Sequence, residues 1–420
     1  MTHSPDHRPA GQGAAPDAGD DDVIALRTTS PGRLEKGAIR LGRLLLRAGL
    51  PPRRLGWRAI LTDRPLDRPD ADPRVEILEP PARTTAPLPR NVPDRAMLSD
   101  DRGWWGFSRR DVPARAVAPT CLVRIEGATV ASFRSDRKRN YEVGFLDGRG
   151  RAVHLPQACF GPGHAALLRR APPTRRVARA TWIAERCYDN HSHWLTAHLP
   201  KLLYLREHGL LGELAMPGRR PAGIDASLAA AGFDPAGWIE VDPMTRLEVD
   251  ALTVLTADRF RPALLEAVRR AHLPDPAPAT ASGRPTRKVL ISRNGARGRK
   301  LLEEGPLWEV LRPMGFERVE MERLDYSDQV RLMQETALLL APHGAGLTNM
   351  IFCAAGTHVV EIADTGYPNP NFYALAAAMG HPYWLIDAKG VGPGHALDRD
   401  LSVAPKAVLD TVARIRAEIE

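Results

Sequence analysis

The sequence has few cysteines and no long apolar segment. Its four cysteines, Cys121, Cys159, Cys187 and Cys353, are scattered through 420 residues without a C-x-x-C spacing, so we predict neither a zinc cluster nor a disulfide framework. No run of about 18 apolar residues occurs, so we predict no membrane-spanning helix. Residues 1–22 lack the apolar core of a signal peptide, which predicts a cytoplasmic chain.

Aromatic residues make up only 6% of the chain, and they do not alternate with basic residues as they do in nucleic-acid stacking platforms. We therefore expect no nucleic-acid partner. The net charge of +8 and the pI near 9.6 favour anionic ligands, although a solvated arginine-rich surface would give the same totals. With 43% hydrophobic and 26% charged residues, the chain is typical of a soluble globular protein of two or three domains.

The pattern of apolar residues divides the chain into six segments. Residues 121–155 alternate apolar and polar residues as strands do, and short strands alternate with helices from residue 177 onward. The predicted segments are a disordered tail (1–32), an N-terminal extension with a basic helix and a β-rich region (33–176), a first α/β domain (177–272), a linker (273–287), a second α/β domain (288–404) and a C-terminal helix (405–420).

The basic helix predicted at residues 33–48 is amphipathic, with Arg40, Arg43 and Arg47 away from its apolar face. Such a helix can lie on an anionic membrane surface. Because Gly37 and Gly42 lie within this helix, packing on its own protein is the preferred interpretation, and contact with the inner face of the cell membrane is the alternative.

The segment HGAGLTN, residues 343–349, combines two glycines, a histidine and hydrogen-bonding side chains, and it follows the apolar run LLLAP. A strand, a glycine turn and the start of a helix are expected here. Glycine lets backbone N–H groups approach a ligand closely, and a helix N-terminus suits a phosphate. A simple tight turn, with His343 as a buried histidine, is the alternative.

Two further segments of the second α/β domain carry charge at the end of a predicted strand. ISRNGARGRK, residues 291–300, brings Arg293 and Arg297 to a strand end where ligands bind in open sheets, and arginine suits phosphate. Glu361 ends the strand HVVEI. A carboxylate there needs a partner, either a ribose hydroxyl pair or an arginine.

The first α/β domain contains NHSHW, residues 190–194, at the start of a predicted helix. Histidine transfers protons near neutral pH, so His191 and His193 are candidate bases. A helix-capping network is the alternative. No third and fourth ligands at suitable spacing accompany the two histidines, so we predict no metal site.

Together these residues resemble glycosyltransferase family 61. ISRNGARGRKLLEE and the stretch from Gln329 through HGAGLTN to Glu361 match its donor half, and NHSHWLTAHLPKLLYL is similar to its upstream histidine segment. The resemblance covers roughly residues 120–390 and is specific after residue 288. It implies an α/β, GT-B-like fold: two Rossmann-like domains that face a cleft, with an extra β-rich N-terminal region here.

The resemblance also implies an inverting, metal-independent glycosyltransferase without cofactor that transfers a sugar from a nucleotide-diphosphate sugar to a glycan or glycolipid, in bacterial capsule or exopolysaccharide synthesis. Residues 177–272 would be the acceptor side and residues 288–404 would bind the donor nucleotide. The candidate donor-binding residues are Arg293, Arg297, His343, Gly344, Ala345, Gly346, Leu347, Thr348, Asn349 and Glu361; the candidate catalytic residues are His193, His191 and Asp189; and the acceptor-side residues are Asn190 and Trp194.

The chain departs from the family at Ala197, where many relatives carry a carboxylate. Inverting transfer needs a group that accepts the acceptor's proton, and here His193, His191, Asp189 or Glu185 is left for that role. A non-catalytic nucleotide-sugar or carbohydrate-binding partner in a polysaccharide assembly complex is therefore the alternative function. A different phosphate-dependent enzyme or a nucleic-acid binder on the same α/β frame is a third.

Overall fold

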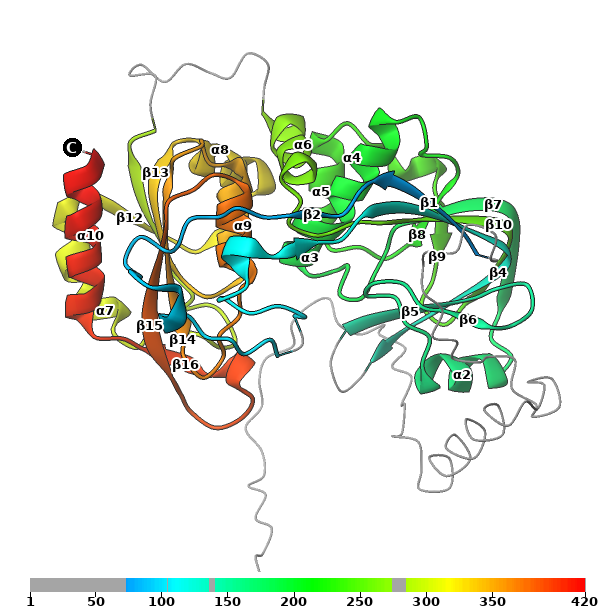
Figure 1. Ribbon diagram of the computed structural model, residues 1–420, viewed down its shortest axis with the longest axis horizontal. Helices are drawn as coiled ribbons and strands as arrows, with labels where there is room; N and C mark the ends of the chain where they lie inside the picture. Colours follow the sequence, from blue (N-terminus) through cyan, green and yellow to red (C-terminus); the bar gives the residue numbers. More distant parts are fainter. Residues whose placement is uncertain (1–72, 104, 136–139, 274–284, 420) are drawn as a thin grey trace, which may run out of the picture.

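The computed structural model describes residues 73–103, 105–135, 140–273 and 285–419, which form two large sheets side by side (Figure 1) and one sheet of two short strands. The predicted tail, the predicted basic helix at 33–48 and most of the predicted linker lie outside these residues. No helix in the described part of the chain is both long and apolar enough to span a bilayer.

The first sheet has eight strands in the order β6-β5-β4-β10-β7-β8-β9, with β1 also paired to β4. Strands β10, β7, β8 and β9 are mutually parallel, whereas β1, β5 and β10 run antiparallel to β4. The strands are β1 (Arg74–Glu79), β4 (Thr120–Ser135), β5 (Asn140–Leu146), β6 (Ala152–Val153), β7 (Thr174–Trp182), β8 (Leu214–Pro217), β9 (Ile239–Val241) and β10 (Arg246–Thr256).

The helical segments of this half are α2 (Pro162–Arg169), α3 (His191–His193), a π-helical turn η4 (Trp194–His198), α4 (Leu199–Glu207), α5 (Ala222–Ala230), η5 (Pro235–Gly237) and α6 (Pro262–His272). Pro200, in the first turn of α4, has no N–H to donate to residue 196. As the sequence predicts, the helical run is interrupted there, and α4 begins at Leu199.

The second sheet has the order β12-β11-β13-β14-β15-β16, parallel except for the last strand. The strands are β11 (Arg287–Ile291), β12 (Phe316–Val319), β13 (Thr336–Pro342), β14 (His358–Asp364), β15 (Tyr383–Val391) and β16 (Asp400–Ser402). The helices are α7 (Glu304–Leu311), η6 (Arg312–Met314), η7 (Met321–Arg323), α8 (Tyr326–Gln334), η8 (Ala345–Phe352), α9 (Asn371–Ala378), η9 (Ala396–Asp398) and α10 (Pro405–Ile419).

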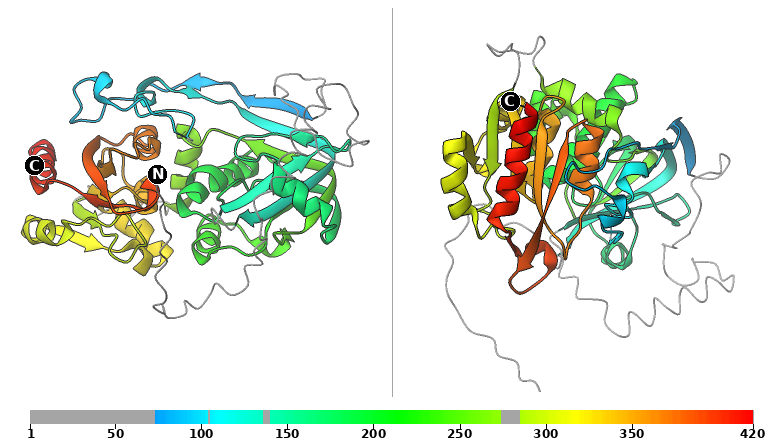
Figure 2. Two further views of the ribbon diagram at one scale, coloured as in Figure 1. Left: turned by 90° about the horizontal axis from the view of Figure 1, so that it is seen from below. Right: turned by 60° about the vertical axis from the view of Figure 1, so that its left-hand side comes forward.

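Alternate residues of the second sheet enter two different cores, as the twofold period of a strand requires. Leu338 and Leu340 pack with α7 and α10 on the outer face. Leu339 and Ala341 belong to a larger core that also contains residues of the first sheet, such as Trp182 and Leu255. The right-hand view of Figure 2 brings the outer helix α10 forward. The inner face of the second sheet therefore shares one continuous core with the first sheet.

A strap made of residues 74–117 (residue 104 excepted) crosses both halves and can be followed in blue and cyan in Figures 1 and 2. It begins at β1, and it contains η2 (Arg95–Met97), η3 (Val112–Ala114) and the paired strands β2 (Ala82–Arg83) and β3 (Ala116–Val117). The Asn91 side chain makes two hydrogen bonds with the backbone of Leu385, at 2.6 and 3.0 Å. Tyr373 donates its hydroxyl to the carbonyl of Pro87 at 2.6 Å. The strap thus ties the second sheet to the first.

The predicted α/β class is confirmed, with parallel strands in both sheets. The strands predicted within the β-rich extension join the sheet of the first α/β segment, because β4 pairs with β10 along its length. The predicted boundary at residue 176 lies within β7 (Thr174–Trp182), whereas the predicted linker separates α6 from β11. The domain boundaries themselves stay predictions.

The buried ion pair between Arg115 and Asp258 offers a test of the strap. Arg115 donates two hydrogen bonds to the carboxylate, at 2.6 and 2.8 Å, and both side chains are about nine-tenths buried. We expect Arg115→Gln to lower the free energy of unfolding in urea by about 3–5 kcal/mol, because it leaves a buried carboxylate unpaired.

Arg124→Gln is the matched control, since Arg124 pairs with Glu76 on the surface with side chains 46% and 52% exposed. This change should cost at most about 1 kcal/mol. Equal effects of the two substitutions would mean that the strap is not held by the buried pair.

Candidate functional site

The second sheet has a topological switch point between β11 and β13. The chain goes from β11 outward to β12 and then returns to the other side of β11 as β13. Ligands of open parallel sheets bind beyond the carboxyl ends of the strands at such a point. Ser292 and Arg293 follow β11, and His343 and Gly344 follow β13, so the two predicted phosphate-binding segments meet at this position.

The first sheet has its own switch point between β7 and β10. After β7 the chain goes to β8 and β9 on one side, and returns as β10 on the other side of β7. Residues 183–193, with the histidine segment, follow β7, and Arg259 follows β10. Contacts between α3 and η8 bring the two switch points together.

Glu361 is the central ionisable group at the switch point of the second sheet, and its side chain is 0% exposed. It lies in the middle of β14, with three strand residues on either side, and not at the end of its strand as the sequence predicts. Its two oxygens accept hydrogen bonds from Nδ1–H of His343 and the hydroxyl of Tyr383. Burial alone would raise its pKa, but His343, Arg109 and the bond from Tyr383 hold the pKa of Glu361 below its usual value. The carboxylate is therefore ionised and occupied by protein donors. The ribose-binding role predicted for Glu361 stays a prediction.

His343 lies between this carboxylate and two arginines. Burial is the main cause that lowers the pKa of His343, and Arg299 and Arg109 add to it against the opposing effect of Glu361. The ring is therefore neutral near pH 7 and carries its proton on Nδ1, toward Glu361. This leaves Nε2 as a hydrogen-bond acceptor, which suits a ligand hydroxyl.

Arg293 lies against the glycine loop. A Cβ placed on Gly344 would come within 2.2 Å of Nη1 of Arg293, so this position must lack a side chain for the guanidinium to lie there. Nη2 of Arg293 donates to the carbonyl of Gly298 at 3.1 Å. Burial, and then the neighbouring Arg299, lower the pKa of Arg293 to about 10. Two partly buried cations close together favour an anion between them.

Of the two arginines predicted to bind phosphate, Arg297 is exposed. Arg299 is the neighbour whose charge acts on both His343 and Glu361. It has a left-handed backbone, with φ 60°, which is uncommon for a residue other than glycine. Arg299 therefore reaches the loop from a strained position two residues after the predicted one.

The predicted loop is mostly buried. Only Ala345 and Gly346 are partly exposed, and Leu347 packs in the shared core. Thr348 is fully buried, and its hydroxyl has no hydrogen-bond partner among the described residues. The loop therefore offers a ligand the backbone of residues 345 and 346, and the donor-binding roles of the remaining loop side chains stay predictions.

Asn349 links the two switch points. Its side-chain oxygen is 2.6 Å from Nε2 of His191, and its amide nitrogen donates to Gln329 at 2.9 Å. Gln329 in turn donates to the backbone carbonyls of Met321 and Leu324. Because the Asn349 oxygen is an acceptor, Nε2 of His191 carries the proton. A predicted catalytic residue and a predicted donor-binding residue thus meet directly.

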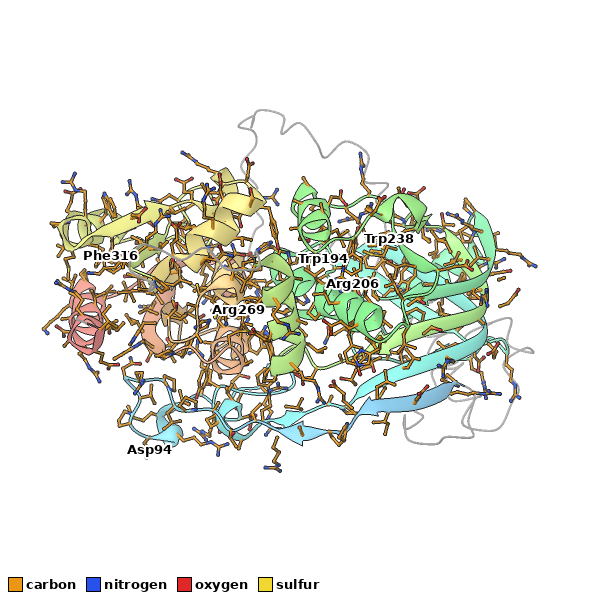
Figure 3. The ribbon with its side chains drawn as sticks, turned by 90° about the horizontal axis from the view of Figure 1, so that it is seen from above. Asp94, Trp194, Arg206, Trp238, Arg269 and Phe316 are labelled. Atoms are coloured by element: carbon orange, nitrogen blue, oxygen red, sulfur yellow. The ribbon has the colours of Figure 1, made fainter. Side chains whose placement is uncertain are left out.

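Three of the other predicted residues of the first half are held by hydrogen bonds or an ion pair to other described residues. Asn190 caps α3 by accepting from the backbone N–H of Ser192 and His193. Asp189 forms an ion pair with Arg134 at 2.5 Å. Trp194, labelled near the middle of Figure 3, is buried and donates to Ser227 at 2.6 Å.

His193 is partly exposed, and no hydrogen bond of its ring to another described residue is found. Burial, with the charges of Arg259, His198 and Arg186 in addition, lowers its pKa well below the usual 6.5. Arg259 is fixed by two hydrogen bonds to the Thr196 hydroxyl, at 3.1 and 2.7 Å. His193 is thus a neutral imidazole beside two arginines.

Glu185, a further candidate base in the sequence, is buried and paired with Lys201. Among the described residues, no group of three His, Cys, Asp or Glu side chains is arranged to hold a metal ion. A depression of about 410 Å³ lies between α4, α6 and the end of α9, and none of the predicted site residues lines it.

Three residues that act on Glu361 or His193 were not predicted as site residues from the sequence: Arg109, Arg259 and Tyr383. Arg259 could have been found, because it follows a strand of the first α/β segment as Arg293 does in the second. Tyr383 begins the strand next to Glu361. Arg109 lies about 250 residues before Glu361 in the chain, and no local pattern marks it.

The comparisons with known proteins agree with the resemblance seen in the sequence. The model of the glycosyltransferase 61 family matches residues 192–360, which confirms that resemblance over this stretch. A beta-1,2-xylosyltransferase of Oryza sativa subsp. japonica is 30% identical over 67 residues, 16% of this chain and 13% of its own length. One from Arabidopsis thaliana is 30% identical over 63 residues, 15% of this chain and 12% of its own length.

The contact between Arg293 and Gly344 gives a prediction about anion binding. Gly344→Ala should displace the flexible guanidinium without unfolding the protein, because the backbone there is extended (φ 175°). We expect pyrophosphate to bind about tenfold more weakly by calorimetry, with little change in melting temperature.

Gly346→Ala is the control, since the nearest atoms to its added Cβ would lie 3.4 Å away, an ordinary contact. Its affinity should stay within about twofold of the wild type. If both variants bind pyrophosphate like the wild type, Arg293 is not part of an anion site.

Proposed function

We propose that this protein is an inverting glycosyltransferase that transfers a sugar from a nucleotide-diphosphate sugar to a glycan or glycolipid acceptor. The observation that carries the proposal is the meeting of two topological switch points, one with arginines and the glycine loop, the other with the histidine segment. The family match over residues 192–360 includes parts of both. In this proposal the two halves are the two Rossmann-like domains of a GT-B-like enzyme.

The donor diphosphate would lie beside Arg293, near the backbone of Ala345 and Gly346. Arginine side chains stabilise the negative charge that grows on a departing diphosphate, and such preorganised charge is usually the largest contribution to catalysis. Because arginines supply that charge, the proposed reaction requires no metal ion. Arg297, exposed on the same loop, would contact the outer part of the donor. His343 would accept a hydrogen bond from a donor hydroxyl through Nε2.

His193 is the proposed general base. Nε2 of His191 is bonded to Asn349, and Asp189 and Glu185 are each paired with a cation. The family's carboxylate position is Ala197, which is buried in η4. The neutral ring of His193 has a lone pair for the acceptor's proton.

In the proposed step the acceptor hydroxyl oxygen forms a bond to the anomeric carbon while the bond from that carbon to the diphosphate oxygen breaks. The electron pair of the broken bond stays on the diphosphate, and the hydroxyl proton passes to His193. The configuration inverts because attack and departure occur on opposite faces. The beta linkage in the names of the two plant relatives would arise in this way from an α-linked donor.

The donor sugar, the acceptor and the cellular role are further parts of the proposal. The chain spans 13% and 12% of the length of the two plant enzymes, so their xylosyl transfer suggests a first donor to test and no more. A role in bacterial capsule or exopolysaccharide synthesis, a cytoplasmic location and contact with the membrane surface stay predictions.

One observation favours a second candidate, a non-catalytic binder of nucleotide sugars. The position at which many relatives carry a carboxylate is alanine, and its side chain is 5% exposed. Such a protein would bind donors without turning them over, so donor hydrolysis separates the two candidates.

Nucleotide binding is the primary test. We expect one or more of the common nucleoside diphosphates to bind the folded protein by calorimetry, and the matching sugar nucleotide to be hydrolysed slowly without acceptor. The panel includes a nucleotide-linked xylose because of the plant relatives. Binding without any turnover would favour the non-catalytic alternative, and a folded protein that binds no nucleoside diphosphate would refute the proposed function.

The base is tested by the pH dependence of transfer. A base acts in its deprotonated form, so the lowered pKa of His193 shifts the acidic limb of kcat/KM to a pH below 6.5. We expect His193→Ala to reduce kcat by about 10²–10⁴-fold without changing the affinity for the nucleoside diphosphate.

His208→Ala is the matched control. His208 is exposed at the end of α4 and bonds the carbonyl of Tyr204, so its loss should leave kcat unchanged. Full activity in His193→Ala would assign the proton to another group.

A further inference from the structure

Arg109 is a buried arginine with unused hydrogen-bond donors. It belongs to the strap, its exposed fraction is 3%, and its Nε and Nη2 atoms have no partner among the described residues. An unpaired buried charge is strongly destabilising. Native proteins keep such a group where a ligand supplies the missing acceptors.

The strap around Arg109 is built to hold it in place. Ser108 donates its N–H and its hydroxyl to Asp111 at 2.8 and 2.9 Å. Arg110 donates from its side chain to the carbonyls of Leu98 and Ala96, both at 3.0 Å. Phe107 packs on Phe260 of the first half. With both flanking residues fixed in this way, Arg109 points into the protein.

The strap reaches the donor-side switch point close to Arg109: the Trp105 ring lies edge-on to the Tyr367 ring, with centroids 5.0 Å apart, and Tyr367 lies edge-on to His343 at 6.1 Å. The charge of Arg109 acts on His343, Glu361 and Tyr383, which lie after β13, on β14 and on β15. Arg299 acts on the same histidine and carboxylate. Arg109 therefore approaches from the strap the same group that Arg299 approaches from the loop after β11.

Positive charges outnumber negative charges around Glu361 at the switch point of the second sheet. The charges of Arg109 and Arg299 act on one fully buried carboxylate, Glu361, and Arg293 is a neighbour of Arg299. Both oxygens of Glu361 already accept hydrogen bonds from His343 and Tyr383. Glu322 acts on Arg293, and Asp398 acts on Arg299. No carboxylate fills the two free donors of Arg109. A ligand with negative charge and several acceptor oxygens would complete the set.

We infer that Arg109 is a further catalytic residue, which binds the diphosphate of the donor from the strap side and stabilises the charge it gains on leaving the sugar. The inference rests on the proposed function. It adds to the site a segment about 80 residues before the start of the family match at residue 192, so the matched region alone does not form the complete anion site.

The experiment compares three ligands on wild type, Arg109→Gln and Arg109→Lys by calorimetry: pyrophosphate, a nucleoside diphosphate and the nucleoside alone. We expect Arg109→Gln to bind both phosphate ligands about 10- to 100-fold more weakly, because it loses charged hydrogen bonds. The weak binding of the nucleoside should not change. Arg109→Lys keeps the positive charge, so its affinity for the phosphate ligands should lie between that of the wild type and that of Arg109→Gln.

Arg102→Gln is the matched control, because Arg102 lies in the same loop, is 66% exposed and pairs with Asp111. It should bind every ligand as the wild type does. Arg109→Gln/Glu361→Gln separates binding from charge balance: if Arg109 serves only to neutralise Glu361, the double variant regains both stability and affinity. On our inference it stays weak for phosphate ligands even where its melting temperature recovers.

The outcomes also separate this inference from the proposed function. Unchanged diphosphate affinity in folded Arg109→Gln, with normal wild-type binding, overturns the inference alone. Wild-type binding of pyrophosphate that depends on Arg109, without binding of any nucleoside diphosphate, keeps the anion site and overturns the function. A wild type that binds none of the phosphate ligands overturns both.

Discussion

The buried carboxylate of Glu361 is the constraint on which the arrangement of the site depends. An ionised carboxylate without water must be surrounded by donors and positive charge. His343 and Tyr383 supply the donors from the strands on either side. This fixes the tautomer of His343 and with it the polarity of Nε2. The same carboxylate explains why arginines from the strap and from the loop after β11 can be buried beside it. The path of residues 74–117 is therefore part of the site as well as a tie between the halves.

The two switch points belong to one packed body. A single core spans the first sheet and the inner face of the second, and His272 bonds Tyr326 between α6 and α8 at 3.0 Å. The strap adds hydrogen bonds to β15. Rotation of one half against the other would break the His191–Asn349 contact at the centre of the site. That contact therefore links the position of the glycine loop to the position of the histidine segment.

Sequence patterns predicted what depends on neighbours along the chain. The strand before HGAGLTN, the strand before Arg293 and the interruption at Pro200 follow from apolar runs and proline chemistry. The second sheet and its switch point could be expected from alternating strands and helices. Contacts between residues that lie far apart in the chain could not be predicted from these local patterns. The charge of Arg109 acts on Glu361 only because the strap lies against the second sheet, and Asn349 meets His191 only because the two sheets share a core. The partners of Glu361, a choice between ribose and arginine in the sequence, include a histidine and a tyrosine.

Ala197, the position at which many relatives carry a carboxylate, lies in the π-helical turn η4. The N–H of Leu199 bonds the carbonyl of Trp194, five residues back, so the turn is wider than an α-helical one. Ala197 is buried within it, where an ionised carboxylate would be costly. The same turn carries Thr196, whose hydroxyl accepts both hydrogen bonds from Arg259. Burial is the main cause of the lowered pKa of His193, and the charge of Arg259 adds to it. In the proposed function, the turn that buries position 197 therefore also holds the arginine that helps to keep His193 unprotonated.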